Sequence, residues 1–153
     1  MGYVDKGQEP RLLIPALRPL YENLAILSYP LLRATAGLFL LAHGWPKLMR
    51  GPEALVGMVN RLGLGLPLFW AWLLIFLETV GALCIVFGLF TRVIAAMLVI
   101  EFAVIVFWAH WSRGFSAGAN GWEYPALWGL VFLAILLRGG GPYSLDRKLG
   151  REF

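Results

Sequence analysis

Residues 24–47 read LAILSYPLLRATAGLFLLAHGWPK, an apolar stretch with one arginine, Arg33, near its centre and a histidine, His43, near its end. An α-helix rises about 1.5 Å per residue, so about 20 apolar residues match the ~30 Å hydrocarbon core of a bilayer. Gly44 and Pro46 then predict that the helix stops. The stretch is therefore predicted to be a membrane span that ends at about His43, with the rest of the chain arranged around it.

The composition excludes an ordinary soluble domain. Of the 153 residues, 59% are hydrophobic and only 14% are charged, so several apolar segments would have almost no polar surface to cover them. The single cysteine, Cys84, excludes an internal disulfide and dithiol redox chemistry within one chain. The net charge of +4 suits an anionic membrane surface, and we expect no nucleic-acid partner.

Three further apolar stretches are predicted spans, at residues 68–90, 93–110 and 122–137. The last has 16 residues and would cover only about 24 Å. Its ends carry the residues that anchor short spans at an interface, namely Trp122, Tyr124 and Arg138. Between the first two spans, an amphipathic segment at 52–62 predicts a short interfacial helix. The expected fold is all-α, a four-transmembrane-helix bundle over residues 24–138.

The two ends of the chain are expected to lie outside this bundle. Prolines at 10, 15 and 19 predict that residues 1–23 form an irregular arm along the membrane surface. The polar start MGYVDKGQEP does not resemble a signal peptide, so the first span is expected to stay in the mature protein. Residues 139–153 combine a glycine-rich break with a charged segment and are expected to form a tail in water.

Basic residues predict the orientation in the membrane. Four spans place both termini on one side, together with the tight turn between the second and third spans. That side holds more basic residues than the other, Lys6, Arg11, Arg18, Arg92, Arg138, Arg147, Lys148 and Arg151 against Lys47, Arg50, Arg61 and Arg113. The positive-inside rule then places both termini in the cytoplasm of a bacterial-type inner membrane.

Each of the first three spans has one charge near its middle: Arg33, Glu78 and Glu101. Counted from the expected span ends, all three lie about 13 to 15 Å deep. An unpaired charge at that depth costs several kcal/mol, so we predict that Arg33 lies between the two glutamates, one of which carries a proton. This network has two interpretations, a structural ion pair that fixes helix packing or a proton relay. Gly37 and Gly44, on the Arg33 face, would allow the helices to approach closely.

A second polar layer is predicted near the outer surface, with His43 and Lys47 after the first span, His110 closing the third and Glu123 opening the fourth. Two histidines from two helices could ligate a haem iron or bond a quinone carbonyl, with Trp45, Trp108, Trp111 and Trp122 as walls. Alternatively, the histidines only satisfy helix-end carbonyls and the tryptophans form an interfacial belt. Only Glu123 could join the histidines as a metal ligand, so no metal site is predicted.

Four blocks in the chain, LLRATAGLFLLAHGWPKL, ETVGALCIVFGLFTR, HWSRGF with GWEYPAL, and GGGPYSLD, resemble the successive signatures of the DoxX family of small four-helix membrane proteins. The resemblance covers residues 31–146, and Glu101 falls outside the signatures. The matching positions are Arg33, His43, Gly44, Lys47, Glu78, Gly88, Thr91, Arg92, His110, Gly114, Phe115, Glu123, Tyr124, Ser144, Leu145 and Asp146.

The family takes its name from a small subunit associated with a terminal quinol oxidase and a thiosulfate:quinone oxidoreductase. The resemblance therefore implies a membrane subunit of a quinone-linked redox complex, accessory rather than an enzyme by itself. Such a subunit would anchor a protein partner and offer a quinone pocket, or less readily a haem pocket, near His43, Lys47, His110, Glu123 and Tyr124. The alternatives are a protein that binds or transports a small molecule, lipid or proton, and a pure membrane scaffold. A bundle of this size is also expected to form a homo-oligomer or to join a larger assembly.

Overall fold

The structure, a computed structural model, describes residues 12–152, and this part of the chain is helical with no strand. Three of its helical stretches are long and apolar enough to cross a membrane: Pro15–Arg50, Pro67–Phe87 and Thr91–Arg113. The all-α class and the first three spans are thereby confirmed. What the sequence predicts for residues 1–11 lies outside the described residues.

The first helix is longer at both ends than predicted. A short 3-10 turn leads into α1, which runs from Arg18 to Arg50 without interruption. The expected irregular arm is therefore wrong over its last residues, because Pro19 lies in the first turn, where its missing N–H has no intrahelical partner. The expected stop at Pro46 is also wrong, since α1 continues through Pro30 and Pro46 and ends at Gly51, which has a φ of 81°.

The second and third spans each contain a π-helical segment. The second consists of α3 (Pro67–Phe76), the π-helix η2 (Leu77–Gly81) and α4 (Ala82–Phe87). The third consists of α5 (Thr91–Val104), the π-helix η3 (Ile105–His110) and a 3-10 turn, η4 (Trp111–Arg113). Such π turns are rare and occur frequently at functional sites.

The remaining helical elements are each shorter than these three spans. The segment predicted at 52–62 is helical as α2 (Glu53–Arg61). A 3-10 turn, η5 (Ala117–Ala119), lies in the loop before α6 (Glu123–Arg138), whose 16 residues fall in the fourth predicted stretch. The chain then forms a last short helix, α7 (Leu145–Leu149).

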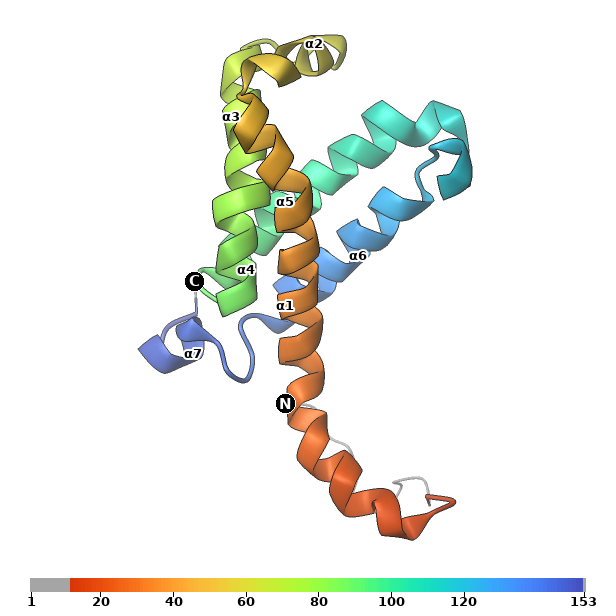
Figure 1. The fold of residues 1–153 in the computed structure, drawn as a ribbon, viewed down its shortest axis with the longest axis vertical. Helices are drawn as coiled ribbons and strands as arrows, with labels where there is room; N and C mark the ends of the chain where they lie inside the picture. The colour runs from red at the N-terminus through yellow and green to blue at the C-terminus, as the bar shows by residue number, and fades with distance from the viewer. Residues whose placement is uncertain (1–11, 153) are drawn as a thin grey trace.

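The helices form two groups that diverge toward one end of the molecule. Figure 1 shows α1 beside α3 and α4, and α5 beside α6, with the second pair inclined away from α1 on the side of α2. At the other end the groups share a core to which α1, α4, α5 and α6 all contribute, including Ala36, Leu40, Ala82, Ile85, Ala95, Leu98, Phe132 and Ile135. The bundle is therefore closed near α7 and open near α2.

Tyr29 marks the level at which α1 joins the bundle. Its hydroxyl donates to the carbonyl oxygen of Gly139, and the guanidinium of Arg138 lies 4.5 Å from its ring centre. None of the residues of α1 before Tyr29 is buried. From Tyr29 to Arg50 the helix rises roughly 32 Å, about the thickness of the hydrocarbon core. The spanning part of α1 thus starts about five residues later than the sequence predicts.

Candidate functional site

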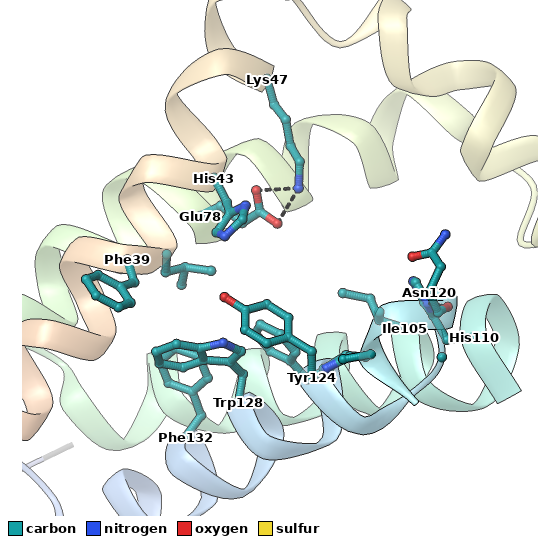
Figure 2. A pocket seen from close by; sticks show the side chains of 15 residues that line it. Phe39, His43, Lys47, Glu78, Ile105, His110, Asn120, Tyr124, Trp128 and Phe132 are labelled. Atoms are coloured by element: carbon teal, nitrogen blue, oxygen red, sulfur yellow. Dashed lines mark hydrogen bonds and ion pairs between the residues drawn. The ribbon is translucent and has the colours of Figure 1, made fainter. Parts of the chain in front are cut away.

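A cavity of about 290 Å³ lies between the two diverging groups of helices. Its lining residues come from α1, η2, α5, η3, the loop at residues 117–121 and α6 (Figure 2). Aromatic and aliphatic side chains cover one part and polar side chains the other, which is the usual make-up of a small-molecule site. Its lining residues are Phe39, Leu40, His43, Lys47, Glu78, Phe102, Ile105, His110, Ala117, Asn120, Gly121, Tyr124, Pro125, Trp128 and Phe132.

An ion pair between Lys47 and Glu78 forms the polar end of the cavity. The ammonium nitrogen lies 2.5 Å from Oε1 and 2.6 Å from Oε2 of the carboxylate. The side chain of Glu78 is buried, whereas that of Lys47 keeps 31% of its surface exposed. This pairing gives the carboxylate a cation inside the membrane and leaves part of the ammonium facing the cavity.

A close approach of two backbones places this pair. Gly44 lies one helical turn before Lys47, and a Cβ atom on it would lie 2.5 Å from the carbonyl carbon of Glu78 and 2.7 Å from its Cβ. Only glycine fits there, so α1 lies directly on η2, as small residues at a helix interface allow. Gly37 makes a similar approach one heptad earlier, with a Cβ position 2.7 Å from the carbonyl oxygen of Ala82.

Glu101 extends the polar end into the protein. Both of its carboxylate oxygens are buried, and no donor among the described residues reaches them. The charged groups that act on it are Glu78 and Lys47. One lysine therefore faces two carboxyl groups, and the second negative charge is left for a proton or a bound ligand to compensate.

The two histidines line the same cavity from different helices, His43 from α1 and His110 from η3 (Figure 2). The Nδ1 atom of His110 is 2.8 Å from the carbonyl oxygen of Asn120, which leaves Nε2 as its second polar atom. The hydroxyl of Tyr124 points toward Glu78 and His43. The structure thus brings together four of the five candidate cofactor-binding residues, His43, Lys47, His110 and Tyr124.

The fifth candidate, Glu123, is not among the lining residues. Its Oε2 accepts a hydrogen bond from the backbone N–H of Ala117 at 2.9 Å and so closes the loop between η3 and α6. The tryptophans expected as walls are not among the lining residues either, and Trp111 instead stacks on Trp122 with ring centres 5.4 Å apart. Within residues 12–152, no three His, Cys, Asp or Glu side chains form a group that could hold a metal ion.

Of the aromatic wall, the sequence predicted Tyr124 but not Phe39, Trp128 or Phe132. Tyr124, Trp128 and Phe132 follow one another every four residues and therefore share one face of α6. Phe39 crosses Trp128 edge to face at 5.9 Å and belongs to a matching series on α1, in which His43 and Lys47 follow at the same spacing. Two facing stripes with a spacing of four were the signal in the sequence that could have revealed the cavity.

Arg33 does not lie between the two glutamates, so the predicted three-residue network is wrong. Its buried guanidinium donates to the backbone carbonyls of Gly140, Tyr143 and Val86, the second at 3.2 Å and the third at 3.5 Å. The reason is depth: Arg33 is four residues beyond Tyr29, so it lies only about 6 Å above the level where α1 joins the bundle. Glu78 and Glu101 lie near the middle of their spans.

The C-terminal segment is docked on the bundle rather than free in water, which corrects the expected tail. The carboxylate of Asp146 accepts hydrogen bonds from the backbone N–H groups of Phe90 and Thr91 at 2.8 and 2.9 Å and from the Thr91 hydroxyl at 2.7 Å. Its own N–H donates to the carbonyl of Gly88 at 2.9 Å. Asp146 and Ser144 are buried. A distant residue thus supplies the N-terminal cap of α5 and closes the tight turn before it.

Arg33→Met is expected to lower the free energy of unfolding by about 2 to 4 kcal/mol, because one buried and two partly buried carbonyls lose charged donors. Chemical denaturation in detergent measures this change, and limited proteolysis reports release of the C-terminal segment. Arg50→Met is the control, because Arg50 lies in the last turn of α1 and is exposed. Equal stability of the two variants would contradict the role given to Arg33.

Comparisons with known proteins agree with these observations. The family model described as DoxX matches residues 29–111, beginning at the residue where α1 joins the bundle. A Haemophilus influenzae protein described only as an uncharacterized protein is 32% identical over 124 residues, which cover 79% of this chain and 90% of the relative. The Escherichia coli inner membrane protein YphA is 29% identical over 122 residues, which cover 76% of this chain and 86% of the relative. No solved structure matches.

Proposed function

The chain belongs to the DoxX family, and from this premise we propose that it is the membrane subunit of a quinone-linked redox complex. In this role it anchors a protein partner and holds the ring of a quinone in the cavity between α1 and α6. The observation that carries the proposal is the composition of the cavity, which combines an aromatic wall with hydrogen-bond donors at one end. The inner membrane is the proposed location, as in the Escherichia coli relative.

The residues of the cavity fit a quinone ring. Phe39, Tyr124 and Trp128 present ring faces and edges against which a planar ring can pack. Quinone oxygens accept hydrogen bonds, and the cavity offers the ammonium of Lys47, the hydroxyl of Tyr124 and the imidazole of His43 as donors. A volume of about 290 Å³ lies at the lower end of the range for ligand sites, roughly 300–1,000 Å³, which suits one ring better than a haem macrocycle.

The two helix groups diverge, and the opening between them provides an entrance for a lipid-soluble ligand. The groups separate toward the end of the molecule where α2 lies (Figure 1), and the cavity lined by Lys47 and His110 is between them. A ring could enter there while its hydrocarbon tail stays among lipid chains. This geometry supports a ligand that arrives through the membrane.

A bound quinone supplies two-electron chemistry that also requires two protons. In this chain, Glu78 and Glu101 carry the buried carboxylate oxygens next to the cavity, and Glu78 pairs with Lys47. Glu101 can hold a proton without loss of a hydrogen bond, because no donor occupies its oxygens. His43 and the hydroxyl of Tyr124 lie near the Glu78 carboxylate, on the side that faces Trp128 (Figure 2). The electrons would come from the partner, since one cysteine cannot form a dithiol couple.

The proposal includes a membrane arrangement. We place α6 as a fourth span beside α5, with Trp122 and Arg138 near its ends as interfacial anchors. Helix α2 then lies along the interface at the open end of the bundle, and both termini lie in the cytoplasm. The basic residues near the termini favour this orientation.

One observation favours a second candidate function, the binding or transport of a proton or small cation. The two carboxylate oxygens of Glu101 are buried, lack a donor among the described residues and lie next to Glu78, as expected of a site that exchanges a positive charge. In that case Glu101→Gln would abolish uptake by vesicles that contain the protein. Under the redox proposal the same variant would slow quinone turnover only when the partner is present.

Purification in mild detergent tests the redox role, with mass spectrometry of every protein and small molecule that elutes with the chain. The proposal expects a quinone and a redox enzyme in near-stoichiometric amounts. Quinone without a redox enzyme would support the pocket but contradict the role as a subunit. A homo-oligomer that carries neither would contradict the proposed function as a whole.

Lys47→Met is expected to weaken the binding of a short-chain quinone by about 10- to 100-fold, because a hydrogen bond from a charged donor is lost. Equilibrium dialysis with a labelled quinone measures the affinity of the purified chain. Lys148→Met is the matched control, since Lys148 lies in α7 and outside the cavity. An unchanged affinity in the Lys47 variant would remove this lysine from the site.

A further inference from the structure

A second cavity, of about 410 Å³, lies beside α7 at the closed end of the bundle. Its lining residues are Gly141, Pro142, Asp146, Arg147, Gly150, Arg151 and Glu152. We propose that this cavity binds the headgroup of an anionic phospholipid, with α7 lying in the adjacent membrane interface. This site is separate from the pocket between α1 and α6 and does not depend on the function proposed for that pocket.

Both carboxylates of this cavity already have partners elsewhere in the bundle. Asp146 is buried and accepts its hydrogen bonds from the start of α5. Glu152 pairs with Arg92, whose guanidinium nitrogen lies 3.2 Å from its Oε2. Among the described residues, neither carboxylate forms an ion pair with Arg147, Lys148 or Arg151.

The basic residues beside the cavity have no such partner. Arg147, Lys148 and Arg151 are exposed, and none of them belongs to an ion pair within the part of the chain that the structure describes. Two of the three, Arg147 and Arg151, line the cavity itself. An arginine fork binds a phosphate group through two parallel hydrogen bonds, so the phosphodiester of a lipid headgroup matches the site in charge and geometry.

Apolar side chains next to these charges favour a lipid over an acidic protein. Tyr143 is 68% exposed, Leu149 is 62% exposed and Leu145 is 38% exposed. The two leucines are four residues apart and so share one face of α7. A helix with leucines on one face and basic residues around them is typical of a segment that lies in a membrane interface.

The position of α7 places this face at the membrane boundary. Asp146 holds α7 against the turn between α4 and α5, and the segment that leads to α7 starts where α6 ends, at Arg138. Three helices of the bundle therefore begin or end beside α7. At that level, phosphate groups and the first carbons of the acyl chains are both within reach, and a lipid supplies the two kinds of contact together.

Native mass spectrometry of the full chain in detergent tests the site, with phosphatidylglycerol as the anionic lipid and phosphatidylcholine as its neutral counterpart. The triple variant Arg147→Gln, Lys148→Gln, Arg151→Gln is expected to bind phosphatidylglycerol at least 10-fold more weakly, since each basic residue near an anionic headgroup contributes roughly fivefold. The matched control removes three basic residues at the other end, with Arg50→Gln, Arg61→Gln and Arg113→Gln, and is expected to bind nearly as the unaltered chain does.

Other outcomes would overturn the proposal. An equal loss of affinity for phosphatidylglycerol in the two triple variants would show a general charge effect. Equal binding of phosphatidylglycerol and phosphatidylcholine would show that headgroup charge plays no role. Displacement of the lipid by millimolar inorganic phosphate would indicate a site for the free anion. Unchanged lipid binding in the α7 variant, with loss of a co-purifying protein, would assign the surface to a protein partner. Asp146 is kept in both variants, and limited proteolysis verifies that α7 stays docked.

Discussion

Gly44→Ala is expected to lower the free energy of unfolding by about 3 kcal/mol or more and to abolish ligand binding. The added methyl group would lie 2.5 Å from the carbonyl carbon of Glu78, and a backbone atom in the middle of a span cannot move aside as a flexible side chain can. Overpacking of a well-packed interior costs roughly 1 to 3 kcal/mol, and more where backbone must shift. Helix α1 would move away from η2, and Lys47 would lose its position over Glu78.

The same substitution elsewhere provides the control. Gly57 lies within α2, and a Cβ atom there would meet nothing within 4 Å. Gly57→Ala is expected to leave binding intact and to raise stability by roughly 0.5 to 1 kcal/mol, because alanine favours the helix. Denaturation in detergent and dialysis with a labelled quinone measure the two effects. If both alanine variants behaved alike, the close approach of α1 and η2 would not position the pocket.

Asp146→Ala is expected to release the C-terminal segment and to lower the free energy of unfolding by about 3 kcal/mol. Three donors, two N–H groups at the start of α5 and the hydroxyl of Thr91, would lose their acceptor in a buried place. Each unsatisfied buried group costs roughly 1 to 3 kcal/mol, and the start of the helix would also lose a favourable negative charge. Susceptibility of the last residues to protease reports the release directly.

Two milder variants control for this prediction. Asp146→Asn keeps one acceptor oxygen and is expected to fall between alanine and the unaltered chain. Glu152→Gln removes only the exposed ion pair with Arg92 and is expected to change stability by less than about 1 kcal/mol. Protease resistance of Asp146→Ala equal to that of Glu152→Gln would show that Asp146 does not hold the segment.

Local patterns were enough to predict the helical elements. Apolar runs of the right length, ended by glycine, predicted the second and third spans within a few residues of their bounds, and the amphipathic segment at 52–62 predicted α2. Pro46 was wrongly taken as a stop, because a membrane helix tolerates an internal proline, as it also does at Pro30, when its neighbours support the backbone. The N-terminal prolines likewise suggested an irregular arm where the first turn of α1 begins.

Contacts between distant residues were not visible in the sequence. Arg33 bonds to carbonyls more than a hundred residues later, and no spacing rule links it to Gly140. Depth along a span was the only available guide, and an error of five residues in the start of α1 moved Arg33 by about 7 Å. The depths of Glu78 and Glu101 were counted from span ends that hold, and these two residues do lie together.

Most of the polar candidates of the pocket were identified because histidine and lysine are rare near spans. Apart from Tyr124, its aromatic half was missed, because the tryptophans considered as walls were those near the helix ends. The residues that line the wall lie one to three turns further along α6, at Trp128 and Phe132. Their identity depends on which face of α6 meets α1, and only the packing of the two helices settles that.

Photo-crosslinking tests the central claim, that the cavity between α1 and α6 binds a quinone ring. The full chain in lipid nanodiscs is exposed to a photoreactive short-chain quinone, and mass spectrometry identifies the modified peptides. We expect labelling of Phe39, Tyr124 or Trp128. Excess unlabelled quinone should suppress this labelling, and Gly44→Ala should abolish it. Labelling confined to lipid-facing residues outside the cavity, unaffected by competitor or by Gly44→Ala, would contradict it.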